Sequence, residues 1–195
     1  MSGLHINYSP RMTAALVEAG AFKEQPFTVV DVGARGGVAS YWSVFGDHLR
    51  IIGFDLDPDE CARLNAIDPR TQYRPYALDA QSHRRTVYVA NYSASSSFYR
   101  TDATYFDRYT AGQNAAVMSE PMLETTTLSA ALSSIGLSSA DFIKVDAEGA
   151  ELDILQGAQD LLPSLQGILS EMRFTKKMRM SGILGGREVS VGAII

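Results

Sequence analysis

A carboxylate and a group of glycines follow the first segment that the sequence predicts as a strand. Asp31 and Gly33 stand at the end of this segment, and Gly36 and Gly37 come directly after it. Glycine allows a tight turn and lets a ligand approach the main chain, while the start of a following helix presents free N–H groups. Asp55 ends the second predicted strand, where a carboxylate can accept hydrogen bonds from both hydroxyls of a ribose. Together, these residues predict a site for a nucleoside.

Asp31 indicates which kind of nucleoside this loop favours. A dinucleotide-binding loop has the pattern Gly-x-Gly-x-x-Gly and holds a pyrophosphate at a helix N-terminus. Here Asp31 takes the place of the first glycine, and its charge would repel a pyrophosphate. The same charge would attract a cationic ligand such as the sulfonium or ammonium group of S-adenosylmethionine. Taken alone, the glycines also fit an ordinary strand-to-helix turn, but Asp31 and Asp55 at two strand ends favour a cofactor.

The order of apolar segments predicts how these residues are held. Strand-like segments alternate with segments of helical spacing, which predicts a doubly wound α/β fold with a parallel sheet and helices on both faces. In such a sheet, ligands bind beyond the carboxyl ends of the strands, where the strand order reverses. Residues 99–120 have only weak hydrophobic periodicity, so we predict neither a helix nor a strand there. We expect strands at residues 27–33, 50–55, 72–78, 85–91, 142–146 and 167–171, and helices at residues 10–21, 36–48, 57–66, 127–136 and 150–162.

Several motifs resemble the FkbM family of S-adenosylmethionine-dependent methyltransferases. The most specific motif is IKVDAEGAELDILQGA at residues 143–158. Shorter motifs are VDVGARGG at residues 30–37, GFDLDP at 53–58, ASSSF at 94–98 and TTL at 126–128. The resemblance covers roughly residues 28–172 in the right order. It implies a Rossmann-like methyltransferase fold, S-adenosylmethionine as the cofactor, and O-methylation of a hydroxyl on a sugar, glycan or secondary metabolite.

The resemblance also implies the cofactor-binding residues. Asp55 would bind the ribose, although the family usually has glutamate at this place. Asp79 follows the third predicted strand, where such folds often contact the adenine amino group, and a solvated turn is the alternative for it. The methionine end of the cofactor would be lined by the first loop, at Asp31, Gly33, Ala34, Gly36 and Gly37.

Carboxylates crowd the predicted end of the strand at residues 142–146 and the start of the next helix. Asp146 or Glu148 would face the transferred methyl group and orient or deprotonate an acceptor hydroxyl. The alternative is that such residues only favour the positive N-terminus of the helix. We expect catalytic roles for Asp146 and Glu148, and we assign Glu151 to the helix N-terminus.

The acceptor side has three further candidates. Ser96 and Ser97 carry short hydroxyls that suit a polar acceptor, and a plain serine-rich turn is the alternative. Glu171 ends the last predicted strand and would be a third carboxylate at the rim of the site. The sequence predicts no metal site, because no metal-ligand spacing links its histidines, His5, His48 and His83.

Length and composition fit one folded domain with extensions. The chain has 195 residues, of which 46% are hydrophobic and 20% charged, which is typical of a globular protein. We expect a helical extension at residues 1–26, a methyltransferase domain at 27–172 and a basic tail at 173–195. The net charge of −5 argues against a nucleic-acid partner. No signal-peptide pattern and no membrane-spanning apolar run is present, so the sequence predicts a cytoplasmic protein.

The C-terminal end departs from the resemblance. Methyltransferases of this class normally finish with an antiparallel strand pair, but the tail offers at most one strand, at residues 188–195. The sequence therefore predicts an incomplete C-terminal strand pair and an exposed sheet edge that would favour a homo-oligomer. Two other functions stay open. A degenerate methyltransferase-fold module without turnover is favoured by the short C-terminus, and an NAD-dependent dehydrogenase is disfavoured by Asp31.

Overall fold

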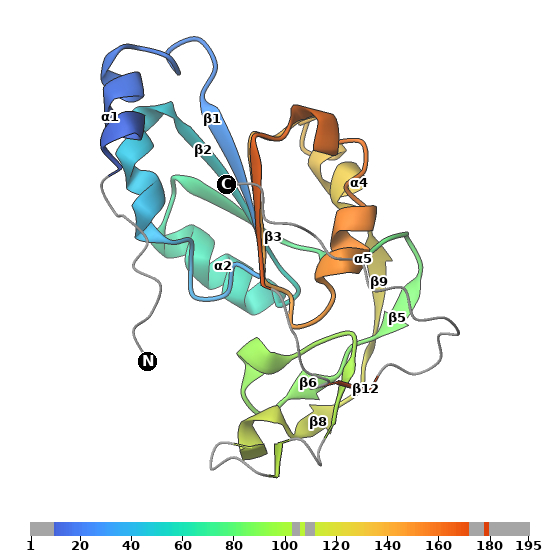
Figure 1. Ribbon diagram of the computed structural model, residues 1–195. Coiled ribbons are helices and arrows are strands. Elements are labelled where there is room, and N and C mark those ends of the chain that lie inside the picture. The colour runs from blue at the N-terminus through green and yellow to red at the C-terminus, as the bar shows by residue number, and fades with distance from the viewer. Residues whose placement is uncertain (1–9, 103–105, 108–111, 172–177, 180–195) are drawn as a thin grey trace.

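Five parallel strands form the centre of the computed structural model, which describes residues 10–102, 106–107, 112–171 and 178–179 (Figure 1). The strand order is β11-β10-β1-β2-β3, so the order reverses between β1 and β10. This confirms the predicted doubly wound, Rossmann-like α/β fold. The bounds are β1 Phe27–Val32, β2 Leu49–Asp55, β3 Thr71–Pro75, β10 Phe142–Val145 and β11 Gly167–Ser170.

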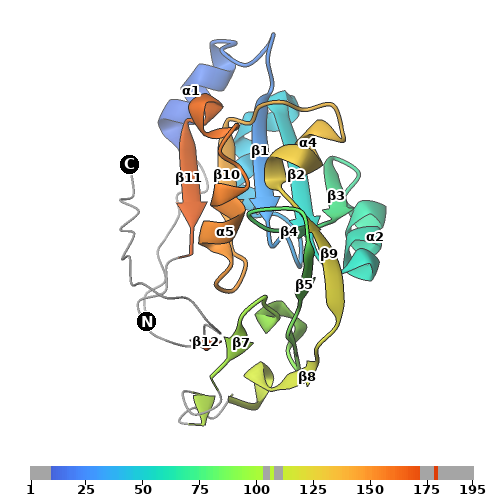
Figure 2. The ribbon, with the colours of Figure 1, turned by 90° about the vertical axis from the view of Figure 1, so that its right-hand side faces the viewer.

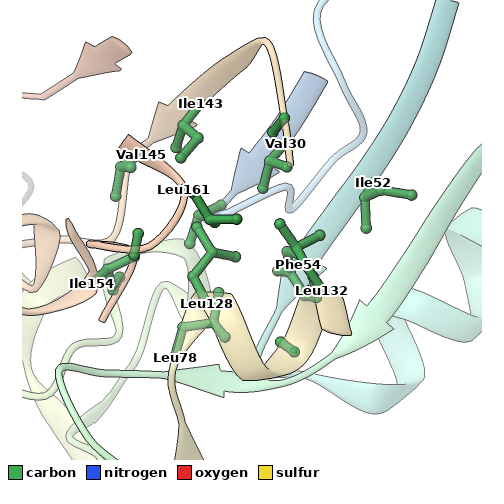
Figure 3. Close-up of a cluster of buried hydrophobic side chains, with 14 of the residues drawn as sticks. Val30, Ile52, Phe54, Leu78, Leu128, Leu132, Ile143, Val145, Ile154 and Leu161 are labelled. Atoms are coloured by element: carbon green, nitrogen blue, oxygen red, sulfur yellow. The ribbon is translucent and has the colours of Figure 1, made fainter. Parts of the chain in front are cut away.

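One face of the sheet packs against α4 (Leu128–Ser133) and α5 (Glu151–Gln156), which lie in front of the strands in Figure 2. The Thr127 hydroxyl begins α4 by accepting a hydrogen bond from the Ala130 N–H. Every residue of β1 is buried, as expected for a strand that is covered on both faces. The apolar cluster between the sheet and these two helices is drawn in Figure 3 and includes Val30, Ile52, Phe54, Leu128, Leu132, Ile143 and Ile154.

The opposite face is covered by the first part of the chain. Alternate residues of a strand point to opposite faces, and Val29 packs here with Trp42 and Phe45. Helix α1 (Arg11–Glu18) contributes its partly buried Val17 to this cluster. The segment predicted as a helix at residues 36–48 instead forms the 3₁₀ element η1 (Ser40–His48), which consists of two helical pieces on either side of a kink at Gly46, where the backbone angles are non-helical.

Helix α2 (Pro58–Ile67) begins where the sequence predicted it, because Asp57 caps it. The Asp57 carboxylate accepts hydrogen bonds from the Asp59 and Glu60 N–H groups. The buried Cys61 and Leu64 of this helix pack against Tyr73 of β3.

The described residues between β3 and α4 form a lobe beneath the carboxyl ends of the strands (Figures 1 and 2). The strand predicted at residues 72–78 is divided, since β3 ends at Pro75, which has no N–H to donate. The strand predicted at residues 85–91 is also divided, because its two halves pair with different partners. The elements here are β4 (Ala77–Leu78), β5 (Arg84–Thr86), β6 (Val89–Ala90), η2 (Ser93–Ser95), β7 (Arg100–Thr101), η3 (Gly112–Ala115), β8 (Val117–Ser119) and β9 (Met122–Thr126).

The final segments are shorter than predicted. Helix α5 ends at Gln156, and Gly157 then packs so closely on the Asp79 carbonyl that a side chain would clash there. The remaining elements are η4 (Leu162–Ser164) and β12 (Met178–Arg179), which pairs with β7. The strand predicted at residues 188–195 lies outside the described residues. Within the described ranges, no helix has the length and apolar character needed to cross a membrane.

Candidate active site

A cavity of about 460 Å³ opens at the carboxyl ends of β1, β2 and β10. It therefore lies where the strand order reverses, which is the expected ligand crevice of an open parallel sheet. Its volume is within the range of about 300–1,000 Å³ that is common for ligand pockets. Across the described part of the chain, its charged lining consists of one guanidinium and four carboxylates, from Arg35, Asp55, Asp57, Asp146 and Glu148.

The structure brings half of the sequence-predicted site residues to this cavity. Those in the lining are Gly33, Asp55, Ser96, Ser97, Asp146 and Glu148. The other six predicted residues lie outside the lining of the cavity. They are Asp31, Ala34, Gly36, Gly37, Asp79 and Glu171.

Asp31 is paired inside the sheet. It is only 3% exposed, and its Oδ1 lies 3.1 Å from Nζ of Lys144, the residue beside it in the register of β1 and β10. Lys144 also lies 3.6 Å from Asp146 Oδ2. Burial raises the pKa of Asp31, while Lys144 opposes that rise. The sequence placed Asp31 against a cationic ligand, whereas in the structure the cation beside it is Lys144. Sequence reasoning missed this lysine, because its role depends on strand register.

Gly33 brings the ends of β1 and β10 into contact. Its φ is +78°, and a Cβ at this position would clash with the carbonyl oxygen of Asp146. The Asp146 N–H in turn donates to the Val32 carbonyl at 3.0 Å. A glycine is therefore required here for the Asp146 loop to pass beside the end of β1.

The rest of the glycine loop supports α2 and β3 instead of the cavity. Ala34 is buried in the cluster with Leu64 and Tyr73. The Gly36 N–H donates to the Glu60 carboxylate at 2.9 Å. A Cβ on Gly37 would lie in ordinary contact with the same two side chains, Leu64 and Tyr73. Among the predicted glycines of this loop, Gly33 alone lines the cavity.

Asp55 reaches the cavity beside an ion pair. Its Oδ1 accepts the Asp57 N–H at 2.9 Å and lies 3.7 Å from the Arg35 guanidinium. Arg35 contacts Asp57 more closely, at 2.5 Å, and donates to the Ser93 hydroxyl at 3.0 Å. Burial raises the pKa of Asp55, and the hydrogen bond from Arg35 lowers the pKa of Asp57. Sequence reasoning missed Arg35, although its place between Gly33 and Gly36 was a usable signal.

Three rim carboxylates come together at the other end of the site. Asp146, Glu148 and Glu171 each place one oxygen within 4.8 Å of the others. The first two follow β10 and the third follows β11, which are parallel neighbours, so their carboxyl ends meet. Oxygen atoms at this spacing suit a polyhydroxylated or cationic group, and they are also the ligand type of hard divalent cations.

The serine segment lines the cavity with hydroxyls that already have main-chain partners. The Ser97 hydroxyl donates to the Glu148 carbonyl at 2.7 Å and accepts the Tyr99 N–H at 2.9 Å. The Ser96 hydroxyl accepts the Ala90 N–H at 3.1 Å. The bond from Ser97 to Glu148 fastens the lobe to the loop that follows β10, whereas the other two bonds lie within the lobe.

Asp79 lies behind the cavity wall, in an ion pair that the sequence did not predict. It is 1% exposed, and its Oδ1 lies 2.7 Å from the Arg85 guanidinium. Arg85 also contacts Asp153 at 2.9 Å, and the Tyr99 hydroxyl donates to the same Asp153 oxygen at 2.6 Å. Burial alone would lower the pKa of Arg85, but its hydrogen bonds to Asp79 and Asp153 raise it. Asp79 is thus committed to Arg85 instead of facing a ligand.

The Arg85 network supports three apolar lining residues. Phe98 lies under the guanidinium, with its ring centroid 4.6 Å from the Arg85 Cζ. Leu78 directly precedes Asp79, and Ile154 directly follows Asp153. All three of these apolar side chains line the cavity. The network therefore stands directly behind one wall of the site.

A family model described as the methyltransferase FkbM domain matches residues 31–183 of this chain. The matched range contains every residue that lines the cavity. This match confirms the family resemblance of the sequence motifs. Comparisons with curated proteins and with solved structures found no match.

Gly33→Ala is expected to destabilise the protein more than Gly36→Ala. Both glycines have positive φ, near +80°, so each substitution costs about 1–2 kcal/mol in backbone conformation. A Cβ on Gly36 meets no atom within 4 Å, whereas on Gly33 it meets the Asp146 main chain. Denaturant unfolding of both variants measures the difference, and equal losses would contradict the close contact between β1 and β10.

Arg85→Gln is expected to lower the free energy of unfolding by about 3–5 kcal/mol, because it removes the guanidinium partner of Asp153 and of the Asp79 side chain, which is 2% exposed. The matched control is Arg84→Gln. Arg84 pairs with Glu124 on the surface, with side chains 64% and 76% exposed, so its loss should cost at most about 1 kcal/mol. Urea unfolding of both variants tests this, and similar losses would show that the Arg85 network does not stabilise the wall.

Proposed function

Because the chain belongs to the FkbM methyltransferase domain family, we propose that it transfers the methyl group of S-adenosylmethionine to a hydroxyl of a sugar, glycan or secondary metabolite. The observation that carries this proposal is the charge of the cavity, with four carboxylates and one guanidinium in its described lining. The sulfonium and ammonium groups of S-adenosylmethionine suit such a lining. A phosphate-bearing cofactor would be repelled by it.

In this proposal, Asp55 accepts hydrogen bonds from the ribose hydroxyls. Its carboxylate is already oriented by the Asp57 N–H. The adenine ring of the cofactor would lie along the apolar part of the lining, at Leu56 and Leu78. Asp79 then acts indirectly, because Arg85 holds it behind Leu78.

The methionine end would lie beside Gly33, where the ends of β1 and β10 meet. Asp146 lines the cavity here. Lys144 forms ion pairs with both Asp146 and Asp31. We therefore propose that Asp31 acts on the cofactor through Lys144 and Asp146, without direct contact. The rest of the glycine loop, at Ala34, Gly36 and Gly37, shapes the site through α2.

When bound, S-adenosylmethionine supplies a methyl group on a positively charged sulfur, and the acceptor oxygen displaces that sulfur in line. The acceptor proton has to leave as the oxygen–carbon bond forms. Asp146 or Glu148 would accept this proton or orient the hydroxyl, which typically contributes about 10²–10⁴-fold. Alignment can contribute more, about 7–11 kcal/mol. Holding the acceptor in place is therefore the main task of the cavity walls.

The acceptor would be held by polar groups at the rim. Glu171 lies next to Asp146 and Glu148, and carboxylates are good acceptors for the hydroxyls of a sugar. Ser96 and Ser97 line the same cavity from the lobe. Phe98 offers an apolar surface that is backed by Arg85.

Three expectations from the sequence stay predictions. They are the domain bounds at residues 1–26, 27–172 and 173–195, the cytoplasmic location, and the homo-oligomer formed through the sheet edge. The edge strand β11 carries Ile168 and Leu169, which are 39% and 43% exposed in the described structure.

Mass spectrometry of the purified protein and calorimetric titration test the proposal. We expect co-purified S-adenosylmethionine or its demethylated product S-adenosylhomocysteine, and we expect binding of S-adenosylhomocysteine but not of NADH. Incubation with S-adenosylmethionine and pools of sugars and glycans should release S-adenosylhomocysteine. Binding of S-adenosylhomocysteine without methyl transfer to any acceptor would support a degenerate methyltransferase-fold module. Binding of NADH alone would support an NAD-dependent dehydrogenase.

Asp55→Asn is expected to weaken S-adenosylhomocysteine binding about 10- to 100-fold, because a hydrogen bond to a charged group is worth about 1.5–3 kcal/mol. Asp59→Asn is the matched control, since Asp59 is an exposed residue of the same region, in the first turn of α2. Isothermal titration calorimetry measures both affinities. Unchanged affinity in Asp55→Asn would remove Asp55 from the cofactor site.

The pH dependence of binding should follow Asp55 as well. Burial raises its pKa above the ordinary 3.8, and only the ionised form accepts both ribose hydroxyls. Affinity should therefore fall as the pH falls through this raised pKa, and Asp55→Asn should lack that step. In the unliganded protein, the contribution of Asp55 to stability should have the opposite trend. Between pH 3.8 and the raised pKa, this contribution should increase as the pH falls, because the folded form binds the Asp55 proton more tightly.

A further inference from the structure

The loop that carries Asp146 and Glu148 has an unfavourable backbone conformation. Glu148 has φ +54° and is the one non-glycine residue with positive φ in the described parts of the chain. Gly149 follows with φ +107°. Residues with side chains seldom adopt this region, because the Cβ comes too close to the main chain. Contacts from outside the loop must therefore hold Glu148 in place.

Glu151 holds this loop from the start of α5. Its Oε1 accepts hydrogen bonds from the N–H groups of Ala147 and Gly149, both at 3.0 Å. Glu151 is 9% exposed, so its carboxylate makes these two bonds in a largely buried position. Hydrogen bonds between a carboxylate and N–H groups are charge-assisted and therefore strong. Glu151 thus has a more specific task than the general attraction to the helix N-terminus that its position in the sequence suggested.

Ser97 holds the same loop from the lobe. Its hydroxyl donates to the Glu148 carbonyl at 2.7 Å. This carbonyl and the Gly149 N–H belong to one peptide group. The Glu148–Gly149 peptide is therefore bound on both sides, by Ser97 at its oxygen and by Glu151 at its nitrogen. Rotation of this peptide plane would break both hydrogen bonds.

We propose that Glu151 and Ser97 are positioning residues that clamp the Glu148–Gly149 peptide and so hold the Glu148 carboxylate beside Asp146 and Glu171. This inference rests on the proposed function, because it names the residues that position the acid–base groups of that site. It also gives Ser97 a second role, in addition to its place among the groups proposed to hold the acceptor. Displacement of reacting groups by about 1 Å can cost a factor of about 10² in rate, so such a clamp directly affects methyl transfer.

The test compares Glu151→Ala with Glu151→Gln in the full chain. Glutamine keeps an oxygen that can accept both N–H groups, whereas alanine removes it. Amide hydrogen exchange, followed by NMR, should be at least about tenfold faster at Ala147 and Gly149 in Glu151→Ala, and close to wild type in Glu151→Gln. Glu124→Ala is the control, since Glu124 is an exposed glutamate whose ion pair lies on the surface.

Calorimetry with S-adenosylhomocysteine measures the consequence for the cavity. Because Asp146, Ala147 and Glu148 line the cavity, we expect affinity about tenfold weaker in Glu151→Ala and restored in Glu151→Gln. Failure of glutamine to restore affinity, or an unchanged affinity in Glu151→Ala, would overturn the positioning role. If the wild-type protein itself does not bind S-adenosylhomocysteine, the proposed cofactor is wrong, and hydrogen exchange still decides whether the clamp exists.

Ser97→Ala keeps the test decisive if Glu151→Ala does not fold. It removes the donor to the Glu148 carbonyl and leaves Glu151 in place. We expect weaker S-adenosylhomocysteine binding in Ser97→Ala and wild-type binding in Ser95→Ala, a substitution two residues away in the same segment. Equal affinities in these two variants would contradict the clamp.

Discussion

The register of β1 against β10 places Asp31 beside Lys144 and Val32 beside Val145. One residue further on, Gly33 lies against the Asp146 main chain, at a contact that admits no side chain. This contact brings the glycine loop and the acidic loop to one point. The cavity exists there because the chain leaves β1 and β10 toward opposite sides of the sheet. The positions of the proposed binding and reacting groups on these two loops therefore depend on the contact between Gly33 and Asp146.

Each cation beside the cavity lies between two carboxylates, so carboxylates outnumber cations in the lining. Lys144 lies between Asp31 and Asp146, and Arg35 lies between Asp55 and Asp57. A third cation, Arg85, is held behind the wall. Buried carboxylates need such partners, because taking an unpaired charge out of water is costly. The arrangement keeps the acidic site compatible with a stable fold and still favourable for a cationic ligand.

The lobe beneath the sheet supplies one side of the cavity lining, which includes Ser93, Ser96, Ser97 and Phe98. Ser93 accepts a hydrogen bond from Arg35, Ser97 binds the Glu148 carbonyl, and Arg85 of the lobe binds Asp153 of α5. These three links join the lobe to the first loop, the acidic loop and a helix of the main domain. In the proposed function, an acceptor bound by the lobe would therefore have a fixed position relative to the cofactor.

The sequence by itself determined the alternation of strands and helices, the family, and the strand ends where carboxylates gather, because local apolar patterns and short motifs encode them. It predicted β1, β2, β10 and β11 nearly to the residue, and it identified Asp55, Asp146 and Glu148, which line the cavity. Tertiary structure alone decided that Asp31 faces Lys144, that Asp79 is committed to Arg85, and that Glu151 binds the acidic loop. It also decided how the lobe divides into short strands, such as β9. The physical reason is that strand register, ion pairing and burial depend on residues far apart in the sequence, so no local pattern specifies which partner a buried charge will have.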